Sequence, residues 1–508
     1  MKILLVYPAY PDTFWSFRYA LKVIHKKAAY PPLGLLTVAS MLPYHWEKKL
    51  VDLNVSPLTD AQIKWADYIF ISGMVVQRES AREVITRCNK LKAKVVAGGP
   101  LFTTEYEEFS GVDHFVLNEA EVTLKAFLTD LAEGTPKPLY TSNERPDITQ
   151  TPVPMWSLID KNKYSAMNIQ YSRGCPFNCE FCDIVILNGR VPRTKTPQQV
   201  IAELEAIYHS GWRESILIVD DNFIGNKNKL KAEILPAITA WMKEHGFPYT
   251  FQTEASVNLA DDEELMNMMV EAGFNKVFVG IESPNEDSLV ECSKAQNTKR
   301  DLVDAVRTLH RHGLEVMGGF IVGFDNDPVT IFKNQINFIQ KSGVVTAMVG
   351  LLNAPRGTRL YQRLVKENRL VKGFSGDNTD FSLNFLPKMD RNTLISGYKN
   401  ILHTIYNQKQ YYQRIMTFIK EYKPVNKRTK PMVKWYQVRA FFSIVWLLGI
   451  VDKGRHHFWR LILTTLVKKP KSIALAFGYA LYGLHFRKVF QKYYEPAPGK
   501  VPVTDIEN

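Results

Sequence analysis

The segment RGCPFNCEFC, residues 173–182, places three cysteines in a C-x3-C-x2-C pattern: Cys175, Cys179 and Cys182. It directly follows a strand expected at residues 168–172, so the three thiols are expected on one loop at a strand end. Thiolates are soft ligands, and three of them on one short loop suit an iron–sulfur cluster or zinc. The pattern therefore predicts a metal site on this loop.

A structural zinc site would need a fourth protein ligand. The nearest downstream candidates are His209, on an expected helix, and Cys292. The triplet therefore fits a [4Fe–4S] cubane with one iron left open for a substrate or cofactor. A zinc knuckle and three unrelated cysteines are the alternatives, and the spacing, the preceding strand and the Gly-Cys-Pro turn at 174–176 favour the cluster. With five cysteines in 508 residues, the chain is not a secreted disulfide framework.

Strands and helices alternate after this loop. A helix is expected at residues 197–210, with Thr196 as its N-cap and proline at the first helical position. Six strand–helix units predict an open or partial barrel, with functional groups at the carboxyl ends of its strands. The expected strands are residues 168–172, 215–219, 249–252, 276–280, 315–322 and 346–351.

The N-terminal region shows the same alternation, which predicts a separate doubly wound parallel sheet. In such sheets ligands bind at the carboxyl ends of the strands. Gly73 follows one expected strand. Gly98 and Gly99 follow another, in a Gly-Gly-Pro turn whose backbone could approach a ligand closely. A tight strand exit is the alternative explanation of the glycines. The expected strands are residues 3–7, 49–53, 68–72, 94–97 and 114–117.

The chain is long enough for two or three domains. We expect an α/β chain with a doubly wound sheet at 1–135, a proline-rich linker at 136–155, a partial (β/α)6 barrel at 156–372 and a helical extension at 373–508.

The positive charge of the chain is concentrated near its C-terminus. Residues 409–500 hold 19 Lys and Arg against 3 Asp and Glu, whereas the remainder holds 45 against 48. Aromatic residues are interleaved with these cations, and two apolar runs, Ala440–Val451 and Ser472–Phe486, are too short to span a bilayer. This composition suits peripheral contact with an anionic membrane. A helical cap with a solvated basic face is the alternative; a stacking groove for single-stranded nucleic acid ranks below both, because no nucleic-acid motif accompanies it.

The N-terminal aliphatic run is too short for a signal-peptide core, and no stretch of about 20 apolar residues is present. We therefore expect a cytoplasmic chain, with peripheral contact at the inner face of the membrane.

The cysteine motif, with its aromatic residue before the last cysteine, resembles the radical S-adenosylmethionine (SAM) superfamily. The resemblance implies a [4Fe–4S] cluster on Cys175, Cys179 and Cys182 whose open iron chelates SAM, and reductive cleavage of SAM to a 5′-deoxyadenosyl radical. The strand end Asp220-Asp221-Asn222 and the segment Gly280-Ile281-Glu282-Ser283 resemble the subgroup that also binds cobalamin, class B. Their polar side chains are thereby implied near SAM; a plain strand-end carboxylate is the alternative for Glu282.

The N-terminal region is similar to the cobalamin-binding domain of that subgroup. Gly73, Gly98, Gly99 and Glu119, the last within Asn118-Glu119-Ala120-Glu121, are the implied cobalamin-side residues. The D-x-H-x-x-G motif that supplies a lower axial histidine is absent. Either cobalamin binds without a protein histidine, which we favour, or the sheet no longer binds it.

The chain as a whole resembles the branch that contains the hopanoid C-2 methylases. The resemblance implies methylation of an unactivated carbon of a hydrophobic substrate, with a flavodoxin or ferredoxin as reductant. A radical cyclase or rearrangement enzyme of the same construction is the closest alternative. A non-enzymatic membrane-associated Fe–S module is the alternative from another class.

Overall fold

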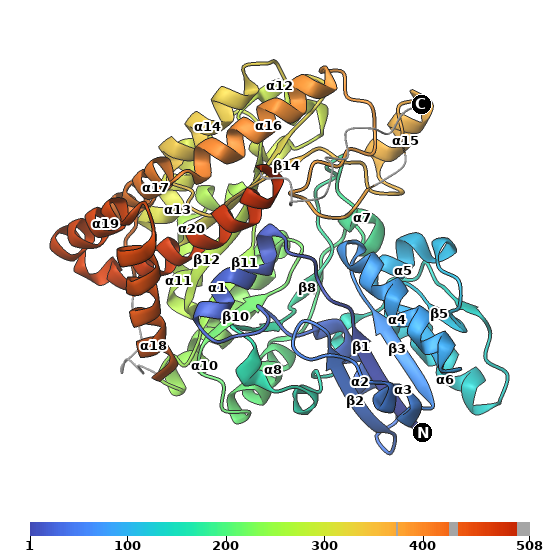
Figure 1. The fold of residues 1–508 in the computed structure, drawn as a ribbon. Helices are drawn as coiled ribbons and strands as arrows, with labels where there is room; N and C mark the ends of the chain where they lie inside the picture. Colours follow the sequence, from blue (N-terminus) through green and yellow to red (C-terminus); the bar gives the residue numbers. More distant parts are fainter. Residues whose placement is uncertain (372–373, 426–434, 495–508) are drawn as a thin grey trace.

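The computed structural model describes residues 1–371, 374–425 and 435–494. The chain forms two six-stranded parallel sheets and a C-terminal helical region (Figure 1). The first sheet lies on one side of the molecule and the C-terminal helices lie on the other, with the second sheet between them.

The N-terminal sheet has the strand order β2-β1-β3-β4-β5-β6, and every pair is parallel. Its strands are β1 (Lys2–Tyr7), β2 (Glu47–Asp52), β3 (Tyr68–Ser72), β4 (Lys94–Gly98), β5 (His114–Val116) and β6 (Leu139–Tyr140). The last of these lies in the segment that was expected to be a linker. Because both faces are covered by helices, the central strands β1, β3 and β4 are apolar along most of their length.

Two separate apolar clusters confirm that this sheet is doubly wound. One face packs against α2 (Leu33–Met41) and α6 (Ala120–Ala132). The other face packs against the remaining helices, which are α3 (Asp60–Trp65), α4 (Arg78–Lys90) and α5 (Pro100–Glu105).

The second sheet has the order β14-β13-β12-β11-β10-β7, and all of its pairs are parallel. Its end strands do not pair with each other, so the predicted partial barrel is confirmed. The strands are β7 (Met167–Ile169), β10 (Ser215–Ile218), β11 (Thr250–Glu254), β12 (Phe274–Glu282), β13 (Glu315–Val322) and β14 (Ala347–Leu351).

The first barrel helix begins where the sequence predicts. Thr196 caps α8 (Pro197–His209) with a capping box that includes Gln199, and a proline occupies the first turn. The other helices are α9 (Lys227–Lys229), α10 (Leu235–Glu244), α11 (Glu263–Ala272), α12 (Glu286–Glu291), α13 (Leu302–Arg311), α14 (Ile331–Ser342) and α15 (Arg359–Lys366).

The chain near its N-terminus crosses from the first sheet to the barrel before it forms α1 (Arg18–Val23). The Phe14 ring stacks on Phe486 with centroids 4.3 Å apart, and the Trp15 indole N–H donates to the Met348 sulfur at 3.0 Å. This crossover therefore joins the two ends of the chain against the barrel.

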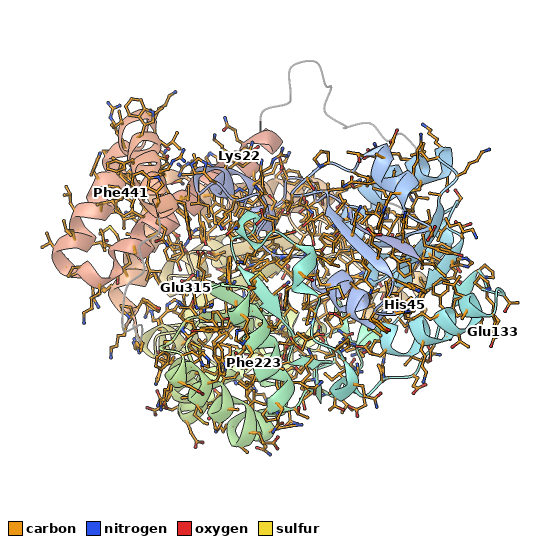
Figure 2. The ribbon with its side chains drawn as sticks, turned by 90° about the horizontal axis from the view of Figure 1, so that it is seen from below. Lys22, His45, Glu133, Phe223, Glu315 and Phe441 are labelled. Atoms are coloured by element: carbon orange, nitrogen blue, oxygen red, sulfur yellow. The ribbon has the colours of Figure 1, made fainter. Side chains whose placement is uncertain are left out.

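The C-terminal region is helical, as predicted. It comprises α16 (Arg391–Tyr406), α17 (Gln408–Glu421), α18 (Trp435–Ile444), the π-helix η11 (Val445–Val451), α19 (Arg455–Lys468) and α20 (Ile473–Tyr494). In Figure 2 the labelled Phe441 of α18 stands at the opposite end of the molecule from His45 and Glu133 of the N-terminal domain. Among the described residues, no helix combines the length and apolarity that crossing a bilayer requires.

Candidate iron–sulfur and cofactor site

The cysteine loop is enclosed by a short antiparallel hairpin of β8 (Ser172–Arg173) and β9 (Arg193–Thr194), with α7 (Ile184–Leu187) between them. Gly174 begins the loop with φ +101, and a Cβ there would lie 2.8 Å from the Val191 carbonyl oxygen. Only glycine fits this turn, because its φ and its close backbone neighbour both exclude a side chain.

The three cysteine side chains of the loop differ in exposure. Cys179 is buried, whereas Cys175 and Cys182 are half-buried. Backbone N–H groups donate to two of the sulfurs: Phe177 to Cys175 and Ile184 to Cys182. Such donors suit a thiolate that carries negative charge.

Burial raises the pKa of both Cys175 and Cys182, and the neighbouring thiol of Cys179 raises them further. Without metal these thiols therefore favour their protonated forms. A metal ligand must be a thiolate, so binding of iron here has to be coupled to release of protons.

Within the part of the chain that the structure describes, no three His, Cys, Asp or Glu side chains converge tightly enough to hold one metal ion. A cubane binds each thiolate at a different iron corner, so its ligands need not converge on a point. Three sulfurs on a glycine-started loop with N–H donors therefore fit a cluster, and they do not form a single-ion zinc site.

The acidic end of β10 organises the cysteine loop. Asp220 is 1% exposed and accepts hydrogen bonds from the Tyr171 N–H at 2.8 Å and the Ser172 hydroxyl at 2.6 Å. Asp221 accepts the Gly174 N–H at 2.7 Å. Both carboxyls thus contact the residues that lead into the loop.

Burial is the main cause that raises the pKa of Asp220 to about 7, and repulsion from Asp221 adds to it, although the hydrogen bonds from Ser172 and Tyr171 lower it. As pH rises through the unfolded-state pKa of about 4, the unfolded chain loses this proton while the folded chain keeps it, so stability falls until about pH 7. In Asp220→Asn we expect this loss, on the order of 4 kcal/mol, to disappear from urea unfolding measured across that range.

Asp304→Asn, at an exposed position, is the matched control and should keep the wild-type pH dependence. An Asp220→Asn protein with the wild-type slope would contradict the assignment.

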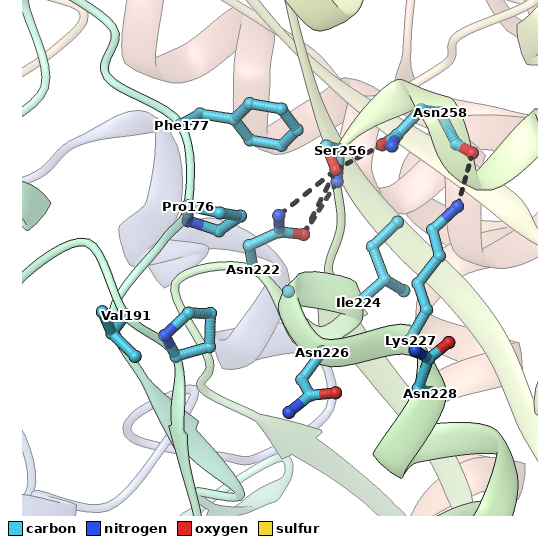
Figure 3. A pocket seen from close by; sticks show the side chains of 12 residues that line it. Pro176, Phe177, Val191, Asn222, Ile224, Asn226, Lys227, Asn228, Ser256 and Asn258 are labelled. Carbon is cyan, nitrogen blue, oxygen red and sulfur yellow. Dashed lines mark hydrogen bonds between the residues drawn. The ribbon is translucent and has the colours of Figure 1, made fainter.

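Asn222 joins the ends of two barrel strands and lines a cavity of about 410 Å³ beside the cysteine loop (Figure 3). Its side-chain oxygen accepts the Ser256 N–H at 3.1 Å, and its amide donates to the Ser256 hydroxyl at 3.2 Å. Asn258 and Lys227 continue this polar wall, and Phe177 of the cysteine loop faces it.

Glu282 ends β12 in the left-handed region, with φ +61, which a glutamate rarely adopts. Its carboxylate lies 2.7 Å from the Lys294 ammonium, and the residue is 6% exposed. A Cβ on Gly280 would clash with the Glu282 carboxylate and lie 2.8 Å from the Lys294 nitrogen. Gly280 is therefore required by this ion pair.

Lys294 is a residue that the sequence did not single out. Burial by itself would lower its pKa, but Glu282 and the thiols of Cys179 and Cys182 outweigh burial and raise it. A fixed ammonium thus stands between the end of β12 and the cysteine loop. Since Lys294 follows α12 in an irregular segment, no periodicity marked it.

Glu254 ends β11, the neighbouring strand of the barrel. Burial, followed by repulsion from Asp221 and Asp220, raises the pKa of Glu254 to about 7, yet its side chain is reached by water. The carboxyl is therefore enclosed by protein and still hydrated, as expected for a group at a barrel mouth.

The predicted cobalamin-side residues lie at the carboxyl edge of the N-terminal sheet. The Glu119 carboxylate forms ion pairs with two arginines of the barrel, with nitrogen–oxygen distances of 2.8 Å to both Arg173 and Arg193. Gly99 has φ +85, and a Cβ on Gly98 would lie 2.5 Å from the Val116 carbonyl oxygen.

These backbone requirements explain Gly98 and Gly99 without a ligand. At Gly73 the nearest neighbour of a Cβ would be the Gln77 side chain, at 3.3 Å. His45 precedes β2 and His114 begins β5, so both lie toward the amino ends of the strands, away from this edge.

Three family descriptions match the chain in the order of its domains. Residues 22–128 match the B12 binding domain, 169–338 match the radical SAM superfamily, and 358–497 match a domain of unknown function, DUF4070.

A hopanoid C-2 methylase from Rhodopseudomonas palustris is 33% identical, with coverage of 92% of this chain and 90% of the relative. This chain belongs to the cobalamin-dependent radical SAM superfamily. An uncharacterised methyltransferase from Synechocystis sp. is 40% identical over 90% of this chain and 86% of that protein. The predicted superfamily and branch are thereby confirmed.

Among solved structures, the radical SAM methyltransferase TsrM from Kitasatospora setae, with cobalamin and a [4Fe–4S] cluster bound, superposes with a TM-score of 0.61. The superposition covers 97% of this chain and 100% of the TsrM chain. Since the sequence identity is 14%, this likeness concerns the fold. The predicted fold class is confirmed. As a cobalamin-dependent radical SAM enzyme, the protein uses a [4Fe–4S] cluster, SAM and cobalamin as cofactors.

Proposed function

We propose that this enzyme, a cobalamin-dependent radical SAM methyltransferase, methylates an unactivated carbon of a hydrophobic substrate such as a hopanoid or another lipid. The observation that carries the proposal is its 33% identity, over about nine tenths of both chains, to a protein named hopanoid C-2 methylase. The inward face of the barrel supports it independently.

Over β12, β13 and β14, part of that inward face is apolar and accessible. Phe278, Met317, Ile321 and Met348 remain partly exposed, whereas strand residues that face the helices, such as Val279, are buried. The Trp15 ring lies edge-on to Phe278, 5.6 Å between centroids, and binds Met348. Apolar walls favour binding of a hydrophobic substrate and keep water away from a reactive carbon centre.

When bound, the cluster, SAM and cobalamin supply the electron, the carbon-centred radical and the methyl group. Cys175, Cys179 and Cys182 would hold the cluster. We assign Glu282, with Gly280 beside it, to the SAM side of the barrel mouth. The ion pair with Lys294 fixes the Glu282 carboxylate, so its role is to orient a cationic or hydroxyl group of SAM.

The remaining predicted residues have proposed roles around these. Asn222 presents its side chain on the cavity wall, while Asp220 and Asp221 position the cysteine loop. The glycine turns at Gly73, Gly98 and Gly99 border the edge where cobalamin would bind, and Glu119 joins that edge to the barrel.

Two partners complete the proposal. A flavodoxin or ferredoxin would supply the electrons, and the enzyme would meet its substrate from the cytoplasm, at the inner face of the membrane. The basic residues within 409–500 support the membrane contact; part of that range lies outside the described residues.

The test is product analysis with the anaerobically reconstituted enzyme, a reductant and extracted membrane lipid. We expect S-adenosylhomocysteine and 5′-deoxyadenosine to form together, with a lipid heavier by one methylene. Deoxyadenosine alone would indicate a cyclase or rearrangement enzyme. No deoxyadenosine with any reductant would contradict radical chemistry. Comparing lipids of cells with and without the gene identifies the substrate.

A further inference from the structure

We infer that α18, η11 and α19 form a membrane-docking hairpin, which inserts its outer apolar face into the interface of an anionic bilayer. Large apolar side chains are exposed along both arms. In the first arm Trp435 is 73% exposed, Phe442 66% and Trp446 60%. In the second arm Leu463 is 57% exposed and Val467 82%.

The exposed residues form a stripe along each arm because they recur at helical spacing. Phe442, Trp446 and Ile450 are each four residues apart, and Trp459, Leu463 and Val467 repeat that spacing. The opposite faces are packed into the core. The buried residues are Ala440, Ile444, Leu448, Phe458, Leu461 and Ile462.

The two arms are tied together. The Trp459 indole N–H donates to the Gly449 carbonyl at 2.9 Å. The outer face is therefore held in place on a fixed support. An apolar face of this kind is unusual on a protein that is surrounded by water alone.

The charges beside the exposed apolar residues favour an anionic bilayer as the partner. Exposed cations accompany the apolar residues: Arg439, Lys453, Arg455, Arg460 and Lys468. The acidic group of the hairpin, Asp452, is held by Arg487 at 2.8 Å. Interfacial Trp and Phe with flanking Lys and Arg are the composition of a segment that lies in an anionic bilayer surface.

Elsewhere the exposed large apolar residues are more scattered, as at Tyr44 and Val329. The hairpin lies at the opposite end of the molecule from the N-terminal sheet, as Figures 1 and 2 both show. Docking through it would hold the cobalamin-binding domain away from the lipid and leave that domain free to contact a soluble reductant. The inference does not rest on the identity of the methylated substrate.

The experiment is flotation of the full-length protein with phosphatidylcholine vesicles that contain or lack phosphatidylglycerol. We expect the wild type to float with the anionic vesicles. Phe442→Ser and Trp446→Ser should each weaken partition about tenfold, because each removes an exposed aromatic side chain that the bilayer would bury. Arg455→Gln and Arg460→Gln should each weaken it about fivefold, and only on anionic vesicles.

Tyr44→Ser and Val329→Ser, which remove exposed apolar side chains from other surfaces, are the matched controls and should float like the wild type. All of the substituted side chains are exposed, so unfolding temperature and cluster absorbance should stay unchanged. Equal flotation of the wild type, Phe442→Ser and Trp446→Ser would overturn the inference. A different result would also overturn it. If the wild type does not float, and light scattering without vesicles shows a dimer that Trp446→Ser dissociates, the apolar face is a protein interface.

Discussion

Cys179→Ala is expected to lose the iron–sulfur absorbance and all cleavage of SAM above background. Cys179 is the most enclosed of the three thiols, and the Gln296 amide lies 3.8 Å from its sulfur. The three cysteines each have to hold a different corner of one cubane, so two cannot replace the third. Iron and sulfide content, the visible spectrum and 5′-deoxyadenosine formation measure the effect.

Cys88→Ala is the matched control, because Cys88 of α4 is fully buried against the N-terminal sheet and packs among apolar residues. It should retain full iron content and SAM cleavage. Cys175→Ala and Cys182→Ala should behave as Cys179→Ala does. SAM cleavage that survives in Cys179→Ala would refute its assignment as a cluster ligand.

Glu119→Ala is expected to lower the free energy of unfolding by about 3–5 kcal/mol, because it leaves the side chains of Arg173 and Arg193 without their buried partner. These ion pairs connect the N-terminal domain to the hairpin that carries the cysteine loop. Arg173 keeps Glu121 at 2.9 Å, which limits the loss on that side. Denaturant unfolding of the purified protein measures it.

Glu79→Ala provides the comparison, since its ion pair with Arg82 is exposed and should contribute no more than about 1 kcal/mol. Cobalamin titration of Glu119→Ala distinguishes a structural role of Glu119, through its ion pairs, from a direct role in binding cobalamin. A variant with weakened cobalamin binding and wild-type stability would favour a direct cofactor role over the ion-pair role. Wild-type stability together with wild-type cobalamin binding would contradict both.

Much of the fold and part of the site follow from local patterns. The C-x3-C-x2-C spacing brings three thiols onto one loop whatever the rest of the chain does. Alternating strands and helices predict both parallel sheets, because a parallel pair needs a crossover of helical length. The Thr196 cap and the acidic end of β10 are readable for the same reason, since neighbours in sequence determine them.

Contacts between distant segments were not readable. The sequence pointed to Glu282 but not to its partner Lys294, and it pointed to Glu119 as a cofactor residue without the two barrel arginines that hold it. Partners of an ion pair need only proximity in space, which no spacing rule expresses.

The sequence by itself determined that this chain carries a three-thiol loop on a barrel behind a doubly wound sheet. Only the tertiary structure separated the two apolar runs near the C-terminus. Ser472–Phe486 packs into the core around Phe14, whereas Ala440–Val451 exposes Phe442 and Trp446. Hydrophobicity indicates that a segment avoids water, but only the space left by the other helices decides which segment finds a protein surface to bury it.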